Sequence, residues 1–496
     1  MKLNLRKPSP YFYLPALSAL LLALSRLPIH LGFLVLFCFL PLINLLAKPA
    51  SKKQLLLAGF SFSAVYALVS LHWLTLVTPG GYVGIFPLFT IYFFLLFLLV
   101  NRCSKKFNIY LTFPIFWLSF EFLQTLGEFR FPWFNAGYSL VDYNVLLQPA
   151  ELGGVYFVSL IILVINIVIH NIIKGNRRSY FTLLALVLVW FGYGLIRLST
   201  LEIEDTGKKV ALVQISVPQE KKWDRAYRDT TLDNYRKFTF EAAKEANLVI
   251  WPESAMPDYV LAPNRSYIRH YIKRLNVEAE VDIFTGFPYY IADDSHPEKY
   301  RFYNCCTLFP QAGEIPEPYF KNILVPFGER MPFLNIFPIL WNVQLGQANF
   351  EYGDELNFYE FEGLTFSPQI CFEIVFPELT RRMAAKSDFI VNLTNDAWFK
   401  RSAGTYQHSM LTRVRAIETR TQIFRAANTG YTMIVTPSGK IEKRSELFDQ
   451  TVVTGSIKIC KNKSLFTKYL FWFPLVPVVI SILIFSFVIF GGKRKE

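Results

Sequence analysis

The chain has 496 residues, of which 52% are hydrophobic and 17% aromatic, and its net charge is +13. This composition is too apolar for an ordinary soluble protein. A net charge this positive is typical of nucleic-acid-binding proteins. Here, however, fifteen basic residues fall in five short clusters and the rest of the chain is close to neutral, which argues against nucleic-acid binding. The clusters lie at residues 2–7, 48–53, 102–106, 174–178 and 493–495.

Eight apolar stretches are each close to the length of about twenty residues that crosses a bilayer. They are residues 9–27, 31–47, 54–78, 82–100, 107–126, 155–173, 180–198 and 467–490. The first is read as a retained span rather than a signal peptide, because it lacks a small-residue cleavage site and a second span follows at once. The sequence therefore predicts a membrane bundle over 1–200 and a final transmembrane helix over 467–490.

The basic clusters fall on every second connection between these stretches, whereas the opposite short loops carry only Arg26 and then Arg130 beside Glu128. Basic loops favour the cytoplasmic side of a membrane. We therefore expect both termini to be cytoplasmic and the block 205–462 to lie outside.

The block 205–462 contains no apolar span and is long enough to bury its own core. Alternating or continuous apolar runs predict strands, and three-to-four spacing predicts two helices, 227–246 and 405–419. The expected strands are 210–216, 248–251, 281–289, 303–309, 364–370, 388–393 and 431–436. These proportions indicate a layered α/β domain.

Three chemically useful side chains close strand-like segments of this domain. Glu253 follows the strand at 248–251, Lys321 follows Tyr319-Phe320, and Cys371 ends the run Ser367-Pro-Gln-Ile-Cys371. A thiolate attacks an ester or amide carbonyl and holds the acyl group as a thioester. A nearby carboxylate can accept the thiol proton, and an ammonium can stabilise the oxyanion. Together they predict nucleophilic acyl transfer.

Each of these residues also has a structural interpretation. Cysteine is common as a small buried residue, Glu253 could cap a helix or lie in a surface loop, and a lone lysine is usually solvated. Three features of the sequence favour the functional interpretation instead. They are the nearby Glu373, the polar run 392–398 and the apolar surroundings of Lys321.

Other chemistries lack a signal in the sequence. The six histidines show no metal-ligand spacing, and we find no P-loop, dinucleotide-binding or serine-nucleophile motif. His408 is interpreted as a packing or hydrogen-bonding residue. The sequence therefore predicts neither a metal nor a cofactor.

Two apolar features inside the aqueous block suggest contact with lipid. Residues 331–341 read MPFLNIFPILW, and Trp223 stands in a polar loop after the first strand. Both could belong to an ordinary core. The functional interpretation is a wall over an acyl chain near the membrane surface.

Several motifs together resemble the apolipoprotein N-acyltransferase family of bacterial membrane enzymes. The resemblance rests on Trp251-Pro-Glu-Ser254, the segment Tyr319 to Glu329 (YFKNILVPFGE), and Ile370-Cys-Phe-Glu373. Further similar segments are Asn395 to Phe399, Gln407-His408, 415–418, 425–430 and the loop 131–138. The resemblance extends over essentially the whole chain.

The resemblance implies a polytopic membrane protein of about eight spans with an inserted nitrilase-like αββα sandwich. It assigns Glu253 as general base, Lys321 as the cation beside the oxyanion and Cys371 as nucleophile. Glu329, Glu373 and Trp223 match supporting residues. The chain departs from the family pattern at two places. Phe372 stands where the family often has tyrosine, so any hydrogen bond made by the tyrosine hydroxyl is lost here. Lys400-Arg401 stand where the family commonly has a glycine and a polar residue.

The implied reaction moves the sn-1 acyl chain of phosphatidylethanolamine, through a thioester on Cys371, to the α-amino group of the S-diacylglyceryl-cysteine of an apolipoprotein. This is the last step of lipoprotein maturation. The expected location is the bacterial inner membrane, with a periplasmic catalytic domain. The expected partners are the phospholipid donor and the lipoprotein acceptor, and we expect a monomer without a cofactor.

Two other functions stay open at this point. A membrane-tethered amidase would use water in place of the amine, although the apolar segment 331–341 has little use in such an enzyme. A non-catalytic scaffold with a decayed hydrolase domain would retain Glu253, Lys321 and Cys371 only by chance.

Overall fold

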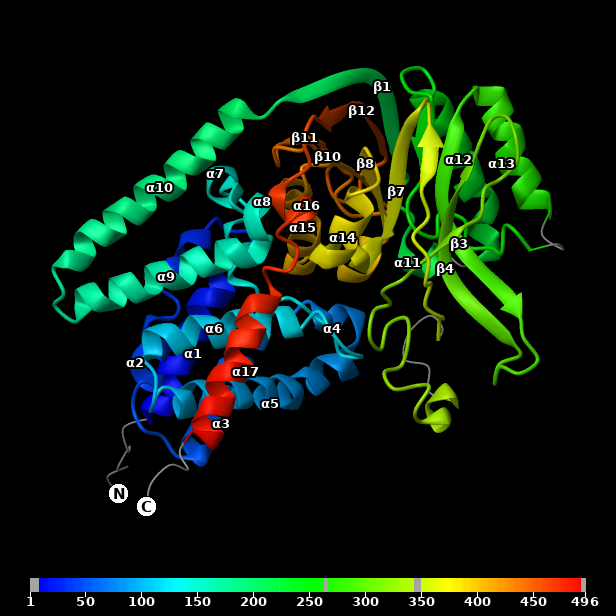
Figure 1. The fold of residues 1–496 in the computed structure, drawn as a ribbon. Helices are drawn as coiled ribbons and strands as arrows, with labels where there is room; N and C mark the ends of the chain where they lie inside the picture. The colour runs from blue at the N-terminus through cyan, green and yellow to red at the C-terminus, as the bar shows by residue number, and fades with distance from the viewer. Residues whose placement is uncertain (1–8, 223, 263–265, 343–348, 492–496) are drawn as a thin grey trace, which may run out of the picture. The chain divides into compact units, whose positions relative to one another are not determined.

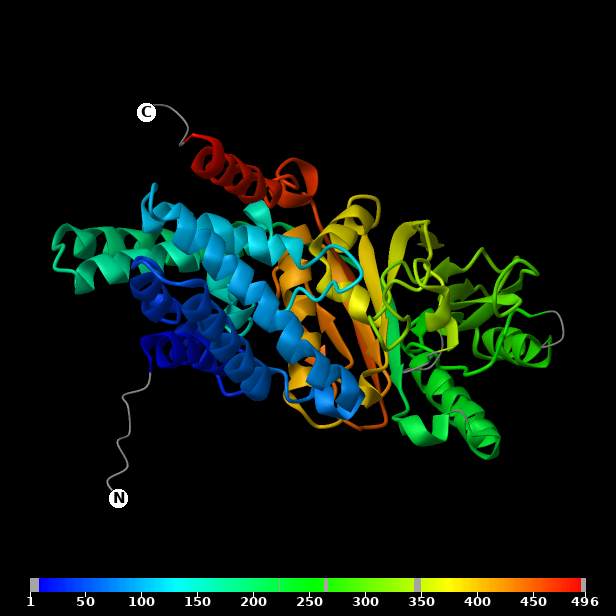
Figure 2. The ribbon, with the colours of Figure 1, turned by 90° about the horizontal axis from the view of Figure 1, so that it is seen from below.

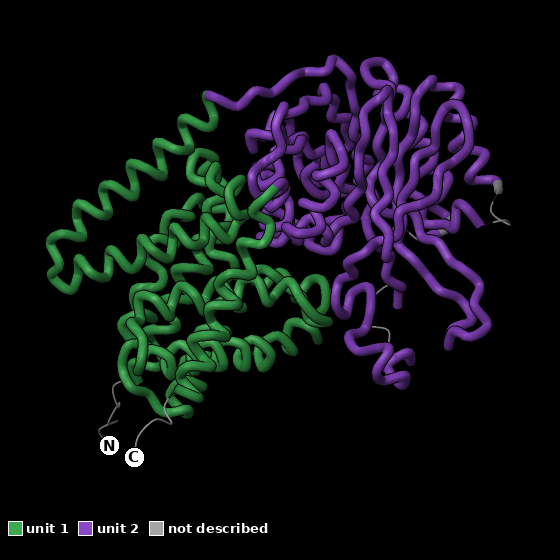
Figure 3. Tube along the Cα trace, viewed as in Figure 1, with its two compact units in different colours: residues 1–199, 469–496 green, residues 200–468 purple. Residues whose placement is uncertain are grey.

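The computed structural model describes residues 9–222, 224–262, 266–342 and 349–491 and divides into two compact units. One unit comprises Met1–Ser199 with Tyr469–Glu496, and the other comprises Thr200–Lys468 (Figure 3). Because the chain leaves the first unit and later returns to it, the second unit is an insertion in a helical protein.

The first unit consists of helices, several of which begin at a polar cap (Figure 1). Ser51 and Gln54 form a capping box at the start of α3, and the Thr78 side chain caps α5. The helices are α1 (Pro10–Leu24), α2 (Leu40–Leu46), α3 (Lys52–Ser70), α4 (Leu74–Val77), α5 (Pro79–Cys103), α6 (Ile109–Leu123), α7 (Asn144–Leu147), α8 (Ala150–Gly153), α9 (Val155–Ile173), α10 (Arg178–Thr200) and α17 (Leu475–Phe490).

Within the described residues, α3, α5, α9 and α10 are long and apolar enough to cross a bilayer. Shorter apolar helices occupy Pro10–Leu24, Gly32–Leu46, Ile109–Leu123 and Leu475–Phe490. Each predicted apolar stretch therefore coincides with apolar helix, while the number of spans stays a prediction.

Some of the predicted boundaries are wrong. The stretch 31–47 is a 3-10 turn followed by α2, which begins where Pro41 fits the first helical turn. The stretch 54–78 is interrupted after Ser70, and in 467–490 the short helix α16 (Leu465–Lys468) ends before α17 begins at Leu475. Apolar composition does not reveal such interruptions.

The second unit contains two six-stranded sheets with the strand orders β12-β1-β2-β3-β4-β5 and β11-β10-β9-β8-β7-β6 (Figures 1 and 2). The first sheet contains β1 (Ile203–Gln214), β2 (Leu248–Ile250), β3 (Asp282–Ala292), β4 (Tyr300–Phe309), β5 (Tyr319–Phe320) and β12 (Thr451–Cys460). The second contains β6 (Tyr359–Phe361), β7 (Leu364–Ile370), β8 (Phe389–Thr394), β9 (Gln422–Ala427), β10 (Met433–Val435) and β11 (Ile441–Arg444).

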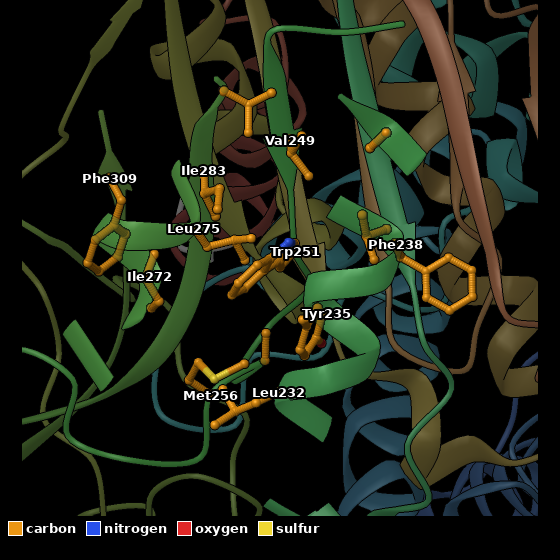
Figure 4. Close-up of a cluster of buried hydrophobic side chains, with 14 of the residues drawn as sticks. Leu232, Tyr235, Phe238, Val249, Trp251, Met256, Ile272, Leu275, Ile283 and Phe309 are labelled. Atoms are coloured by element: carbon orange, nitrogen blue, oxygen red, sulfur yellow. The ribbon is translucent and has the colours of Figure 1, made fainter. Parts of the chain in front are cut away.

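The two sheets face each other, and helices cover their outer faces. Phe284 of β3 meets Phe366 of β7 edge-on, with ring centroids 5.1 Å apart. The helices are α12 (Arg228–Ala242), α13 (Ser266–Ala279), α14 (Pro377–Ala384) and α15 (Ala403–Thr419). Side chains of α12 and α13 pack on β2 and β3 in one buried cluster (Figure 4). The αββα sandwich predicted from the sequence is confirmed.

The central strands of each sheet are parallel, which aligns their carboxyl ends. Val210 of β1 pairs with Leu248 of β2, and Leu248 pairs with Asp282 of β3. In the second sheet β7, β8 and β9 are likewise parallel. The loops that follow β2 and β7 carry Glu253 and Cys371, so the fold delivers both residues from strand ends.

The predicted strands are all present, with ends shifted by a few residues, but several elements are missing from the prediction. Strand β12 pairs antiparallel with β1 from Cys460 to Thr451. Its sequence TVVTGSIKIC carries a glycine and two polar residues in its centre, and half-exposed positions weaken the apolar signal. The strand-like segment Tyr319-Phe320 is present as the short strand β5. The short strands β6 and β11, the fully buried β9, and helices α13 and α14 escaped the prediction.

We expect the substitution Trp251→Ala to lower the free energy of unfolding by about 3–5 kcal/mol, because a large buried ring is replaced by a cavity. Trp251 is fully buried, stacks on Tyr235 with centroids 4.5 Å apart, and donates a hydrogen bond to Thr239. Thermal denaturation of the full chain measures the loss. Tyr267→Ala is the control, since Tyr267 is 65% exposed, and equal melting temperatures for the two variants would contradict the prediction.

Candidate active site

Glu253, Lys321 and Cys371 come from three strand ends, two in the first sheet and one in the second. Glu253 follows β2, Lys321 follows β5, and Cys371 follows β7 and begins a 3-10 turn, Cys371–Val375. The Lys321 ammonium lies 3.5 Å from the Glu253 carboxylate. Within this unit the structure therefore brings acid and amine into direct contact.

Hydrogen bonds hold the Glu253 carboxylate in one orientation. Asn304 donates its side-chain amide to Oε1 at 2.8 Å, and the backbone N–H of Asn395 donates to Oε2 at 2.9 Å. Glu253 is only 6% exposed. A buried carboxylate with fixed partners is prepared to exchange a proton at a defined position.

Lys321 is fully buried beside two carboxylates. Its Nζ donates to Glu329 Oε1 at 2.8 Å and lies 3.5 Å from Glu253. Burial alone would lower the pKa of Lys321, but Glu329, Glu253 and the Cys371 thiol raise it above its usual value. Asn304 also donates to Glu329 Oε1, and the backbone N–H of Val325 donates to Oε2. Lys321 is therefore a fixed cation at neutral pH.

Cys371 has a left-handed backbone with φ of +51°, which is uncommon for a residue with a side chain. Burial raises the pKa of its thiol, and the negative charge of Glu253 raises it further, against the opposing Lys321 charge. The residue still keeps part of its surface exposed. At neutral pH the resting group is therefore a thiol, and attack on a carbonyl requires a base to remove its proton as the new bond forms.

Glu373 connects the turn that begins at Cys371 to the loop that carries Lys321. Its Oε2 accepts the backbone N–H of Ile370, and its Oε1 accepts the backbone N–H groups of Asn322 and Ile323 and the hydroxyl of Tyr319. Burial raises the pKa of Glu373 to about 7, although these hydrogen bonds oppose the shift. Every partner is a donor, so this carboxyl group orients backbone on both sides of the site.

A buried charged cluster of Asp396, His408 and Arg425 lies behind Cys371. Asp396 accepts from Arg425 at 2.8 Å, and its other oxygen lies 2.8 Å from His408 Nδ1. His408 Nε2 is 3.2 Å from the carbonyl oxygen of Cys371. Burial would raise the pKa of Asp396, but Arg425 and His408 hold it well below its usual range. The cluster thus connects a buried ion pair to the backbone of Cys371.

The sequence predicts that His408 packs or forms hydrogen bonds, and the structure adds that its partners are Asp396 and the backbone of Cys371. The sequence offers a signal in Asn395-Asp396 and Gln407-His408, but not the pairing with Arg425, which lies on a different strand. Gly430 belongs to the same arrangement, since a Cβ atom there would come within 2.3 Å of Asp396 Oδ2.

Lys222 is a site residue that sequence reasoning missed. It ends α11 (Gln219–Lys222), is 7% exposed, and donates to the backbone carbonyl of Glu253 at 3.0 Å. Burial lowers its pKa to about 8, against the charges of Glu253 and Cys371. A lysine in a polar run normally predicts a solvated side chain, so no sequence signal could have found it. The predicted supporting residue Trp223 lies outside the described residues.

The apolar segment 331–341 is divided between core and surface. Met331 and Leu334 are buried, whereas Ile336, Phe337 and Ile339 are each more than half exposed. This segment leads into the 3-10 turn Pro338–Asn342. An apolar surface of this kind is unusual on a domain in water.

As a whole the site offers a thiol, a carboxylate and an ammonium in a largely dry environment, which suits formation and breakdown of a thioester. In the part of the chain that the structure describes, no group of three or more His, Cys, Asp or Glu side chains could hold a metal ion.

Two family models match the chain. Residues 18–168 match the apolipoprotein N-acyltransferase N-terminal domain, and residues 209–461 match the carbon-nitrogen hydrolase domain. The second match covers about half of the chain, and the first lies within the helical unit.

Similar proteins can be aligned with most of the chain. The chain is 32% identical to the apolipoprotein N-acyltransferase of Geobacter metallireducens over 494 residues, covering 93% of this chain and 92% of that one. It is 31% identical to the enzyme of that name from Pseudomonas putida, covering 77% and 74%, and 29% identical to the one from Rickettsia prowazekii, covering 90% and 92%.

Among solved structures, similar chains come from the nitrilase superfamily. An amidase from Nesterenkonia sp. has 16% identity and a TM-score of 0.40, covering 52% of this chain and 92% of its own. Nit3 of Saccharomyces cerevisiae has 18% identity and a TM-score of 0.40, covering 50% and 89%.

We expect Lys222→Met to slow alkylation of Cys371 by iodoacetamide about three- to tenfold below pH 7, because the Lys222 ammonium favours the thiolate there. Lys222 loses its proton in the wild type as pH rises through about 8. The difference between the two proteins should therefore disappear above that pH. Mass spectrometry of the Cys371 peptide measures the rate. Lys222→Arg, which keeps its charge, should stay fast throughout, and a difference independent of pH would contradict the prediction.

We expect His408→Ala to lower the free energy of unfolding by about 1–3 kcal/mol, since the buried Asp396 carboxylate and the Cys371 carbonyl each lose a partner. Thermal denaturation measures this loss. The matched control is His72→Ala, because His72 is exposed. Similar melting temperatures for His408→Ala and the wild type would show that the cluster contributes no net stability.

Proposed function

The chain belongs to the apolipoprotein N-acyltransferase family, and we propose that it transfers a fatty acyl chain from a membrane phospholipid to the N-terminal amine of a diacylglyceryl apolipoprotein. The observation that carries this proposal is the cluster of Cys371, Glu253 and the doubly paired Lys321 at strand ends of a domain inserted between apolar helices. The family membership, at 32% identity over nearly the full length of a relative, supports the choice of substrates.

In the first half-reaction the Cys371 sulfur attacks the carbonyl carbon of the phospholipid ester. Glu253 accepts the thiol proton, which is needed because burial keeps the thiol protonated. Lys321 stabilises the negative charge that develops on the carbonyl oxygen, since its own charge is fixed by Glu329. Collapse of the tetrahedral intermediate expels the glycerol oxygen, Glu253 returns the proton to it, and a monoacyl phospholipid leaves.

In the second half-reaction the free α-amino group of the apolipoprotein attacks the thioester. Glu253 accepts the amine proton and returns a proton to the departing Cys371 sulfur, so the thiol is restored and an amide is formed. The thioester retains enough group-transfer potential for amide formation, so this route uses no external energy source or cofactor.

The membrane arrangement is part of the same proposal. This is a bacterial membrane protein, and the positive clusters favour cytoplasmic termini with the catalytic unit in the periplasm, next to the inner membrane. Eight spans would satisfy this orientation, since both termini then lie on one side. The exposed Ile336, Phe337 and Ile339 suit a wall for lipid chains near the membrane surface. Nothing in the chemistry requires more than one copy.

The test is the intact mass of the detergent-purified full chain after incubation with phosphatidylethanolamine and no acceptor. We expect a fatty-acyl increment on the wild type that a diacylglyceryl-cysteine peptide discharges. Cys371→Ala should show no increment. Glu253→Gln should acylate at least about a hundredfold more slowly, within the usual contribution of a general base.

Two other results would replace this proposal. An acyl increment that water removes as fast as the peptide does would indicate a hydrolase. A correctly folded protein that acquires no increment from competent lipid would favour the scaffold.

A further inference from the structure

The helical unit contains a groove of about 580 Å³ that is lined by α5, α6, α17 and the segment that follows α6. Its walls are almost entirely apolar and include Leu95, Phe120 and Ile482. None of the residues discussed for catalysis lines it. A volume of this size lies within the range of sites that enclose one small ligand.

The two serine side chains that line the groove are paired with each other. Ser119 of α6 and Ser481 of α17 hydrogen bond at 2.8 Å. Ser119 also donates to the carbonyl of Ile115 at 2.8 Å. Because both hydroxyl protons are engaged within the protein, this part of the lining donates nothing to a ligand and suits a hydrocarbon chain.

Gln124 at the carboxyl end of α6 breaks this pattern. It lines the groove, is 7% exposed, and its Nε2 donates to the carbonyl of Phe120 at 3.2 Å. Its buried Oε1 has no hydrogen-bond partner among the described residues. A buried acceptor without a donor is costly, so a ligand that carries an O–H or N–H group would favour rotation of the Gln124 amide until its Oε1 faces the groove.

These features suit an amphiphile that has one hydrocarbon chain and one hydrogen-bond donor next to it. From Phe116 to Gln124 the helix rises about 12 Å, which is room for part of one extended chain. In the proposed topology Gln124 lies at the outer end of α6, so the polar end of the ligand would face the periplasm. A diacyl glycerophospholipid carries only esterified oxygens next to its chains, whereas a monoacyl one carries a free hydroxyl there.

We propose that this groove binds the monoacyl glycerophospholipid released in the first half-reaction, with its chain along α6 and its free hydroxyl donating to Gln124 Oε1. This assignment of the natural ligand rests on the proposed function. A hydroxyl engaged by Gln124 is not available to attack the thioester in reverse. The groove would therefore favour forward transfer to the amine.

The test uses the full chain with Cys371→Ala, which binds lipid without turnover, in nanodiscs. The probe is lysophosphatidylethanolamine with a diazirine in its acyl chain, and cross-linked peptides are mapped by mass spectrometry. We expect labelling to concentrate on α6 and α17 and to exceed that on the exposed face of α10 around Phe181 and Val189, which reports ordinary annular lipid. Unlabelled lysophosphatidylethanolamine should compete, and the diacyl lipid should compete at least about fivefold less well.

Two pairs of variants separate the groove from its surroundings. Gln124→Leu should reduce groove labelling about five- to tenfold, and Gln124→Glu, which keeps an acceptor, should retain most of it. Leu123→Trp should block the groove, whereas Leu111→Trp on the same helix should not. Leu123 lines the groove and Leu111 does not, although the two are similarly exposed, at 50% and 47%.

Equal labelling of α6, α17 and α10 would overturn the proposal that the groove is a binding site. Equal competition by the diacyl lipid, or no effect of Gln124→Leu, would overturn the monoacyl assignment. Binding in the Cys371→Ala protein is independent of turnover. Selective labelling without acyl-enzyme formation in the wild type would thus refute the proposed reaction alone, and the reverse result would refute this groove alone.

Discussion

The candidate active site depends on one buried charge, the Lys321 ammonium between the carboxylates of Glu329 and Glu253. Removing a lysine from water is costly unless opposite charges and hydrogen bonds compensate for it. Here two carboxylates do so, and Asn304 donates to both of them. Burial raises the pKa of the Cys371 thiol, and the Glu253 charge raises it further against the opposing Lys321 charge, so the thiol stays protonated until a base removes its proton.

The sandwich provides these charges with a rigid frame. Glu253 and Lys321 follow strands of the first sheet, and Cys371 follows a strand of the second, so no single segment could hold all three. Glu373 joins the lysine loop to the turn of the nucleophile through four donors. The left-handed backbone of Cys371 is retained because the surrounding contacts leave it no alternative. The same buried polar groups therefore position the three side chains and set the charge around them.

The proposed acyl transfer between two lipids would explain why such a domain is inserted in a helical membrane protein. A soluble hydrolase could use the same thiol, carboxylate and ammonium with water as acceptor. The apolar helices supply a second environment, in which chains rather than head groups are recognised. The groove lined by Ser119, Ser481 and Gln124 is the proposed example, because the two serine hydroxyls hydrogen bond to each other and the rest of its lining is almost entirely apolar.

The sequence alone determined the apolar stretches, the layered α/β class and the strand-like segments that lead to Glu253, Lys321 and Cys371, because apolar periodicity and short motifs are local. The αββα arrangement followed from the family resemblance. The sequence could not determine that Lys222 is buried against the Glu253 backbone or that Asp396 pairs with Arg425, nor could it find β12 beside β1. These features depend on contacts between segments far apart in the chain. Burial and partners, which set the charge of a side chain, exist only after the sheets and helices have packed.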